Sequence, residues 1–331
     1  MRQRSSILRM RAQNVGSRGN MKPTVISTFA GCGGSSLGYK MAGFRELLAV
    51  EWDDHAVKIF KINFPDVPVY HGDIAKLSSA ECMQMAGINK GELDVLDGSP
   101  PCQGFSTTGK RKYDDPRNSL FNEFARLAND MRPKVFVMEN VTGMVKGHMK
   151  QAYLEIVKPL RGCGYVVKGE VLNAMYYNVP QSRQRVIIIG VRNDLNIEPS
   201  HPKPQTRPIT FRQATKDLWD DDADLYFNPN TLTTIAMKKA RQGEKDPKHF
   251  SRQKLHADKP GHTLRKDVLG YWHPEKFRPL NLNEWVRLGS FPDEFKWTDK
   301  KNACHCIGNS VPPNLMKAIA LHVKGQILER M

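Results

Sequence analysis

The feature that most constrains the fold is a repeated alternation between β-rich apolar runs and helix-length polar segments across residues 23–141. Each of five such runs ends in a polar or glycine-rich segment. In a parallel sheet these segments would meet at one edge, beyond the carboxyl ends of the strands. The sequence therefore predicts an α/β fold with a doubly wound sheet. The predicted strands are Pro23–Phe29, Phe44–Val50, Val67–Tyr70, Leu93–Leu96 and Val135–Met138.

Charge is the most informative bulk property. The chain of 331 residues carries a net charge of +16 at pH 7, which indicates a polyanionic partner, most often nucleic acid. The longest apolar stretches, such as Val186–Ile189, are far shorter than a membrane span, and no secretory signal follows the basic start. Six cysteines in a chain of this length do not indicate a disulfide framework, so we expect an intracellular protein.

Four segments are expected along the chain. Residues 1–22 carry five arginines and no acid, which indicates a disordered basic arm, although Met21 could equally be the true start. Residues 23–191 form the main domain, 192–277 a small second domain, and 278–331 a segment that returns to the main domain. Within the second domain, residues 237–266 hold ten basic and three acidic residues, a net charge of +7. Its expected core is Trp219, Leu225, Phe227, Leu232, Ile235 and Leu255.

A glycine-rich loop follows the first predicted strand. Glycines in this loop, which opens a helix, let the main chain approach a ligand. It is not the dinucleotide fingerprint, because Ser36 stands at the position of the third glycine. Glu51 and Asp73 end the next two strands, and Trp52 offers a stacking surface. One such acid is often only a helix cap, but two of them beside the loop favour an adenosine ligand.

Cys102 follows a Gly-Ser-Pro-Pro turn at the end of the fourth predicted strand. Two prolines stiffen this turn, and a thiolate held there is a candidate nucleophile. From this stretch alone, a small buried cysteine in a tight turn is equally well supported.

Three further groups of polar residues are candidates for a role in catalysis or binding. Glu139 ends the strand beside that of Cys102 and could move a proton, or could simply cap a helix. In Gln181-x-Arg183-x-Arg185 the alternation predicts both arginines on one strand face, where they could bind a phosphate, a base edge or Glu139. Cys304-His305-Cys306 lacks a second ligand pair at zinc spacing, so we expect no metal.

Taken together, these motifs resemble those of the DNA (cytosine-5)-methyltransferases, from Val25 to the C-terminus. Six motifs appear in the family's order. They are Phe29–Gly34, Pro100–Ser106, Glu139-Asn140-Val141, Gln181-x-Arg183-x-Arg185, Arg278–Asp293 and Gly308-Asn309-Ser310.

The resemblance implies a Rossmann-like, S-adenosylmethionine-dependent methyltransferase sheet with residues 192–277 as target-recognition domain. It implies that Cys102 is the nucleophile, that Glu139 is the proton donor, and that Arg183 and Arg185 hold the target base and Glu139. The residues it assigns to the cofactor are Phe29, Ala30, Gly31, Gly33, Glu51, Trp52, Asp73, Ile74 and Asn309. DNA contacts are expected from Gln103, Ser106, Lys110, Arg111, Arg117 and Thr263.

One departure concerns the first motif, because Ser27 stands where the family usually has Asp. The function predicted from the resemblance is methyl transfer from S-adenosylmethionine to C5 of a flipped-out cytosine in a specific duplex DNA sequence. We expect a monomer of the restriction-modification type, with a cognate endonuclease as a further partner.

Three alternatives remain at this point. A transfer-RNA methyltransferase of the same fold typically has Pro-Phe-Thr after Cys-Gln, whereas this chain has Gly104-Phe105-Ser106. A non-catalytic DNA-binding relative usually loses one of the four catalytic residues, and all four are present here. A nicotinamide-dependent enzyme lacks support because the third glycine is missing.

Overall fold

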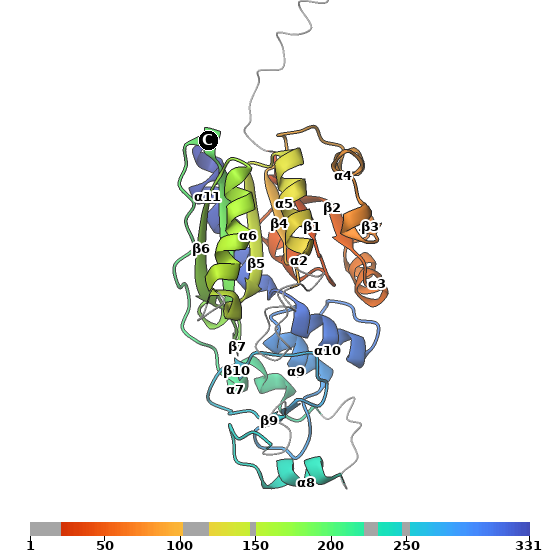
Figure 1. Ribbon diagram of the computed structural model, residues 1–331. Helices are drawn as coiled ribbons and strands as arrows, with labels where there is room; N and C mark the ends of the chain where they lie inside the picture. The colour runs from red at the N-terminus through yellow and green to blue at the C-terminus, as the bar shows by residue number, and fades with distance from the viewer. Residues whose placement is uncertain (1–20, 102–118, 146–149, 222–230, 247–251) are drawn as a thin grey trace, which may run out of the picture.

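The computed structural model describes residues 21–101, 119–145, 150–221, 231–246 and 252–331 (Figure 1). The expected basic arm therefore lies outside the described residues, apart from Met21 and Lys22. The chain forms a larger lobe built on a sheet and a smaller lobe beside one edge of that sheet.

The larger lobe contains a seven-stranded sheet with the order β3-β2-β1-β4-β5-β8-β6. The pairs among β1 to β5 are parallel, and β8 runs antiparallel to both of its neighbours. The order reverses at β1, so β1 and β4 flank the switch point at which ligands bind in such sheets. The strands are β1 (Thr24–Thr28), β2 (Arg45–Glu51), β3 (Val69–His71), β4 (Val95–Gly98), β5 (Val135–Val141), β6 (Tyr165–Asn173) and β8 (Gln184–Arg192).

Helices cover both faces of this sheet (Figure 1). Successive residues of a strand point to opposite faces, so Ile26 and Leu96 join one core while Val25 and Val95 join another. The first core lies beneath α4 (Ser79–Ala86), α5 (Ser119–Met131) and α6 (Lys150–Gly162). The second lies beneath α2 (Gly34–Met41) and α11 (Pro313–Gln326).

The smaller lobe shares a third core with the edge of the sheet lobe. Trp285 is fully buried in this core, together with Phe60 of the sheet lobe and Phe211 and Leu255 of the smaller lobe. The elements around this core and in the rest of the smaller lobe are α3 (Asp54–Asn63), α7 (Phe211–Ala214), α8 (Leu232–Lys239), α9 (Leu282–Leu288) and α10 (Lys300–Asn309), with the two-residue strands β7 (Gln181–Ser182), β9 (Gln253–Lys254), β10 (Gly261–His262) and β11 (Tyr271–Trp272).

The predicted doubly wound α/β fold is confirmed, and each predicted strand overlaps an observed one. Two details differ. The segment Gly308–Pro313 was expected to open the final helix, but Gly308 and Asn309 end α10 and the last helix begins only at Pro313, after its N-cap Pro312. Ile235 was expected in the core of the small domain but is 42% exposed. Leu225 and Phe227 lie outside the described residues.

The boundary expected at residue 192 is not marked by a break in packing. The hydroxyl of Tyr177 donates a hydrogen bond to the carbonyl of Pro202, and Ser200 contacts His322 of α11. Residues 200–206 therefore lie against the sheet lobe, and the smaller lobe begins near Phe211. None of the described helices has the length and hydrophobicity needed to span a membrane.

Candidate active site

The glycine loop lies at the carboxyl end of β1. Phe29 and Gly31 have φ angles of 55° and 57°, and Gly33 has a φ of 96°. For Phe29 this is an uncommon conformation, of the kind found at functional sites. A Cβ atom on Gly33 would meet the Phe64 ring at 2.4 Å, whereas one on Gly31 would meet nothing within 4 Å. The loop is therefore packed at Gly33 and open at Gly31, as a ligand cradle requires.

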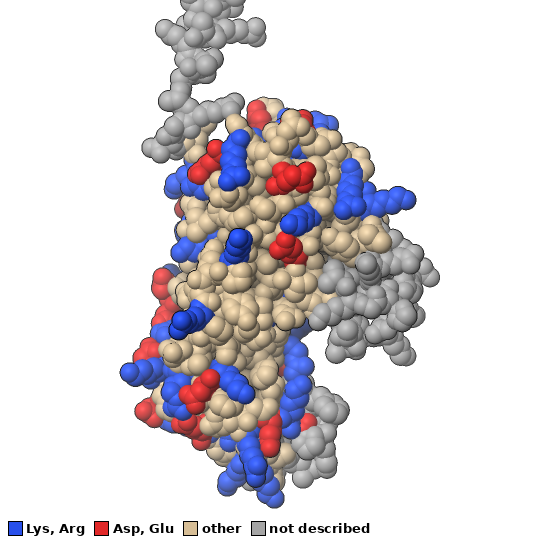
Figure 2. Space-filling view, turned by 90° about the vertical axis from the view of Figure 1, so that its left-hand side faces the viewer, with Lys and Arg blue, Asp and Glu red and all other residues tan. Residues whose placement is uncertain are grey.

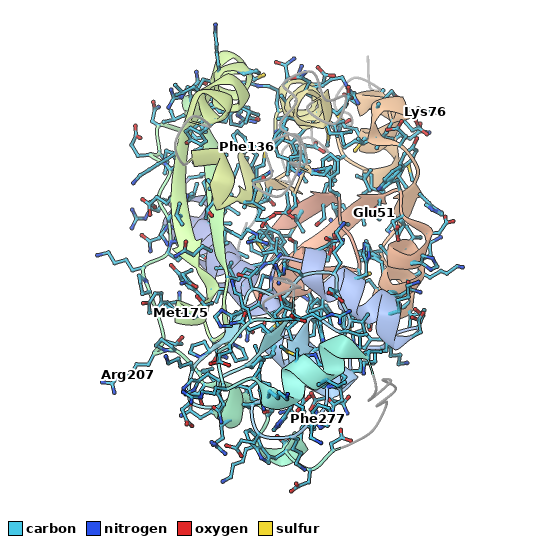
Figure 3. The ribbon with its side chains drawn as sticks, turned by 60° about the horizontal axis from the view of Figure 1, so that its bottom comes forward. Glu51, Lys76, Phe136, Met175, Arg207 and Phe277 are labelled. Carbon is cyan, nitrogen blue, oxygen red and sulfur yellow. The ribbon has the colours of Figure 1, made fainter. Side chains whose placement is uncertain are left out.

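Glu51, at the end of β2, shapes this loop. One carboxylate oxygen accepts a hydrogen bond from the backbone N–H of Gly31 at 2.7 Å. Its other oxygen accepts from Trp52 and Asp53, at 2.8 and 2.9 Å. A carboxylate offers about four acceptor positions, so three are filled and about one is left for a ligand hydroxyl. Figure 3 shows Glu51 within the molecule, among the strand ends of the sheet lobe.

The other predicted cofactor residues gather around the same edge. The Trp52 side chain is 77% exposed beside Glu51, so its ring is free to stack. Asp73 accepts a hydrogen bond from the N–H of Ala75 and caps a short 3-10 helix that begins at the buried Ile74. The capping role weighed from the sequence is thus present, and it uses Oδ1 of Asp73. Ala30 is buried and Asn309 is exposed at the end of α10.

Asn140 secures the turn that leads toward Cys102. Its side-chain amide is buried and donates a hydrogen bond to the carbonyl of Pro100 at 2.9 Å. Its oxygen accepts from the N–H of Val141. The sequence assigned no role to Asn140, although its place beside Glu139 at a strand end was a usable signal. The predicted residues Cys102, Gln103, Ser106, Lys110, Arg111 and Arg117 lie outside the described residues.

Glu139 and Arg185 meet across the pairing of β5 with β8. Arg185 Nε lies 2.7 Å from Glu139 Oε1, and both side chains are largely buried, at 12% and 9% exposure. The pairing brings Val141 opposite Arg185, so the two strands hold both side chains at the sheet edge beside β4. A buried ion pair of this kind fixes the direction of the carboxyl group.

Arg183 differs from Arg185, contrary to the prediction of a shared strand face. The backbone breaks between β7 and β8 at this residue, and Arg183 turns toward the C-terminal segment. It donates hydrogen bonds to the carbonyls of Leu264 and Gly308, both at 3.1 Å, and is only 2% exposed. Burial, and to a smaller extent the charge of Arg185, lower its pKa to about 9. Arg183 therefore ties the smaller lobe to the end of α10.

Thr263 and Gln181 also belong to this junction between the smaller lobe and the sheet lobe. The Thr263 hydroxyl donates a hydrogen bond to the carbonyl of Ser182 at 2.8 Å, so its hydrogen is used within the protein. Gln181 donates to the carbonyl of Leu288 and accepts from the N–H of Leu264. The expected DNA contact of Thr263 stays a prediction, and its hydroxyl oxygen is the atom that could make it.

The basic segment of residues 237–266 lies in the smaller lobe. Among the described residues of this segment, seven basic side chains are exposed, namely Lys238, Lys239, Arg241, Lys245, Lys259, Arg265 and Lys266. In Figure 2, Lys and Arg side chains run along the right-hand edge of this lobe, below the sheet lobe. The sheet lobe thus contributes the carboxyl ends of its strands, and the smaller lobe contributes a surface of exposed basic side chains.

Comparison with known proteins decides the family. The family model described as C-5 cytosine-specific DNA methylase matches residues 23–325. The chain belongs to this family. It is 36% identical over 324 residues to the Type II methyltransferase M1.HphI of Haemophilus parahaemolyticus, covering 91% of this chain and 86% of that protein. It is 42% identical over 365 residues to the Type II methyltransferase M.DdeI of Desulfomicrobium norvegicum, covering 89% and 87%.

Solved structures agree with this assignment. A prophage-encoded protein of E. coli, described as a DNA modification methyltransferase, has a TM-score of 0.78 and 25% identity, covering 93% of this chain and all of that chain. The DNMT2 of Spodoptera frugiperda, with a TM-score of 0.67 and 18% identity over 89% of this chain and 98% of its own, shares the fold. As a member of the C-5 cytosine-specific DNA methylase family, the protein is a DNA (cytosine-5)-methyltransferase.

Cys304, His305 and Cys306 lie on α10 of this methyltransferase. Cys304 and Cys306 are buried and His305 is exposed. Across the described ranges, no three His, Cys, Asp or Glu side chains gather where they could hold a metal ion.

Proposed function

We propose that this methyltransferase transfers the methyl group of S-adenosylmethionine to C5 of a cytosine flipped out of duplex DNA, through a covalent bond between Cys102 and C6. The observation that carries the proposal is the buried Glu139–Arg185 pair, held at the strand edge next to the Pro100 turn. Carboxyl group and nucleophile would thus act on one ring from adjacent strands.

The cofactor edge fits S-adenosylmethionine. Gly31 faces open space, Trp52 offers an exposed ring for the adenine, and Glu51 keeps about one acceptor position for a ribose hydroxyl. Asp73 would accept from the adenine amino group beside Ile74. Phe29, Ala30, Gly33 and Asn309 complete the surroundings. When bound, the cofactor supplies an electrophilic methyl group.

The protein's own residues would make the cytosine reactive toward that group. The Cys102 thiolate adds to C6 while Glu139 donates a proton to N3, which turns the ring into an enamine that is nucleophilic at C5. After methylation, loss of the C5 proton breaks the Cys102–C6 bond and frees the enzyme. Arg185 would hold Glu139 in place during both steps. Flipping the base costs a few kcal/mol.

The smaller lobe would choose the DNA sequence. Its exposed basic side chains would bind phosphates and base edges, together with Thr263 and the residues expected from the sequence at Gln103, Ser106, Lys110, Arg111 and Arg117. We further infer that the enzyme acts as a monomer and serves a restriction-modification system with a cognate endonuclease.

Covalent trapping tests this mechanism. A duplex carrying 5-fluorocytosine at the target position has no C5 proton to lose, so the bond to Cys102 would persist in the presence of S-adenosylmethionine. We expect a denaturation-resistant protein–DNA adduct whose cross-linked peptide contains Cys102. No adduct forms with Cys102→Ala. An adduct at another residue, or turnover with no adduct on the fluorinated duplex, would refute the covalent role of Cys102.

A further inference from the structure

Arg126, on α5, is hydrogen-bonded to the turn that would receive the adenine, and it has no part in the reaction proposed above. Its Nη2 donates to the carbonyl of Leu77 at 2.8 Å and to that of Ile74 at 3.3 Å. Its Nη1 donates to the hydroxyl of Ser79, the first residue of α4, at 3.1 Å. One side chain of α5 therefore binds both ends of the 3-10 helix Ile74–Lys76 and the start of the helix that follows.

The turn that carries Asp73 has little support of its own. It follows β3, a strand of only three residues at the edge of the sheet, which pairs with β2 alone. A single 3-10 turn has poor hydrogen-bond geometry, and here the N–H of Leu77 reaches the carbonyl of Ile74 at 3.2 Å. Figure 3 shows Lys76, the last residue of this 3-10 helix, toward the outer side of the sheet lobe, farther out than Glu51. The position of Asp73 therefore depends on contacts made outside the strand.

Arg126 is itself held in place on α5. Its neighbour Leu127 is fully buried, and its Nε donates to Glu123 Oε2 at 2.7 Å. The hydroxyl of Ser79 donates in turn to Asp130 Oδ2 at 2.7 Å. Glu123, Arg126 and Asp130 are spaced three and four residues apart, so they share one face of the helix. A guanidinium carries several N–H donors in a rigid plane, and it can bind two carbonyls and a hydroxyl while it remains paired with a carboxylate.

We propose that Arg126 is a positioning residue for the cofactor, which holds the turn after β3 so that the Asp73 carboxylate meets the adenine amino group. Because α5 shares a core with Leu96 of β4 and Phe136 of β5, Arg126 also fixes this turn relative to the two strands that end at the proposed catalytic site. This inference rests on the proposed function, because it assumes that S-adenosylmethionine binds with its adenine at Asp73.

A comparison of two ligands tests the proposal. S-adenosylhomocysteine is the cofactor without its methyl group, and S-inosylhomocysteine carries an oxygen in place of the adenine amino group. Their Kd values are measured by isothermal titration for the wild type, Arg126→Met, Arg126→Lys and Asp73→Ala. Arg192→Met is the matched control. Arg192 also pairs with a carboxylate, that of Asp194, and donates to a main-chain carbonyl, that of Arg132, both at 2.7 Å, but it lies beside the amino-terminal end of β5.

We expect the wild type to bind the adenosyl compound about tenfold more tightly than the inosyl compound, and Asp73→Ala to reduce this preference to about twofold or less. Arg126→Met should reduce it to the same extent, because the turn no longer holds Asp73 against the amino group. Arg126→Lys keeps the charge but not the planar set of donors, so it should give an intermediate preference. Arg192→Met should lower thermal stability and keep the wild-type preference.

Hydrogen exchange of the protein without ligand gives a second readout. The amides of residues 73–77 should exchange with deuterium faster in Arg126→Met than in the wild type, because the turn opens more easily without its external donors. In Arg192→Met these amides should exchange at the wild-type rate. If Arg126→Met fails to fold, Arg126→Lys carries both measurements.

Two results would overturn the inference. One is an Arg126→Met protein that keeps the preference for the adenosyl compound while Asp73→Ala loses it. The other is equal weakening of both compounds in Arg126→Met, which would show a general loss of structure and no effect on the adenine contact. A wild-type protein that binds neither compound, or a preference that survives in Asp73→Ala, would instead refute the proposed cofactor site, so the failures are distinguishable.

Discussion

The two lobes of the molecule hold their functional residues in different ways. In the sheet lobe, Glu51 and Glu139 stand at the ends of regular strands, and the chemistry expected of them depends on their own side chains. The smaller lobe has strands of only two residues. It is joined to the sheet lobe by Arg183 and Gln181, which bind main-chain atoms of residues 264, 288 and 308.

This difference separates catalysis from recognition. Every residue offers the same main-chain carbonyl and N–H groups, so the smaller lobe can change its surface side chains without losing the hydrogen bonds that attach it. Strand-end side chains of the sheet lobe have no such freedom. Substitutions at the strand ends of the sheet lobe should therefore lower the methyl-transfer rate. Substitutions at the junction between the lobes should instead lower the free energy of unfolding.

The largest effect is expected at Glu139. Glu139→Gln keeps the shape of the side chain but removes the acid, and should lower the methyl-transfer rate about 10²- to 10⁴-fold. The free energy of unfolding should change little by comparison. Glu170→Gln on the exposed part of β6 is the control, and should leave the rate unchanged. A Glu139→Gln enzyme with wild-type turnover would remove Glu139 from the chemistry.

Substitution of the two arginines by methionine separates the two functions directly. Arg183→Met leaves two buried carbonyls without donors and should lower the free energy of unfolding by about 3 kcal/mol, measured by urea denaturation. Arg185→Met should lower it by only about 1 kcal/mol while slowing methyl transfer at least about tenfold, because Glu139 loses the group that orients it. Equal stability losses in the two variants would contradict the assignment of Arg183 to the junction.

A smaller effect is expected at Gly31, where a matched control variant isolates the contribution of the glycine loop to cofactor binding. Gly31→Ala adds a methyl group in the open loop at a φ of 57°, and Gly87→Ala adds one at a φ of 65°, also with nothing within 4 Å. Each should lose about 1 kcal/mol of stability from backbone strain. Isothermal titration with S-adenosylmethionine should show binding about tenfold weaker for Gly31→Ala alone. Equal affinities of the two variants would remove Gly31 from the cofactor site.

The smallest effect concerns pH and Glu46 of β2, whose carboxyl group accepts a hydrogen bond from the hydroxyl of Ser36 on α2 at 2.8 Å. Burial raises the pKa of Glu46 to about 7 from an ordinary value near 4.5. The folded protein therefore binds this proton more tightly than the unfolded chain, so the stabilisation is complete below about pH 4.5 and is lost as the pH rises through 7. Urea midpoints at pH 5 and pH 8 should differ less for Glu46→Gln than for the wild type. Parallel shifts in both proteins would contradict this role.

The sequence predicted the sheet lobe much better than the smaller lobe, for physical reasons. The strand around Val135 begins with a continuous apolar run and the strand around Val25 is rich in β-branched residues, because both faces of these strands are buried. The glycine loop is recognisable by its composition. Arg183 was placed on the wrong face, since a two-residue period assumes an unbroken strand and the backbone breaks there. The core of the smaller lobe is assembled from short, distant segments around Trp285, for which no periodic signal exists.

The most direct test of the central claim is methyl transfer itself. Purified protein is incubated with labelled S-adenosylmethionine and a mixed-sequence duplex DNA, and 5-methylcytosine is mapped by bisulfite sequencing. We predict label at cytosines of one short sequence for the wild type, and no transfer by Cys102→Ala with cofactor binding retained. Label in transfer RNA and none in DNA, or turnover by Cys102→Ala, would contradict the account.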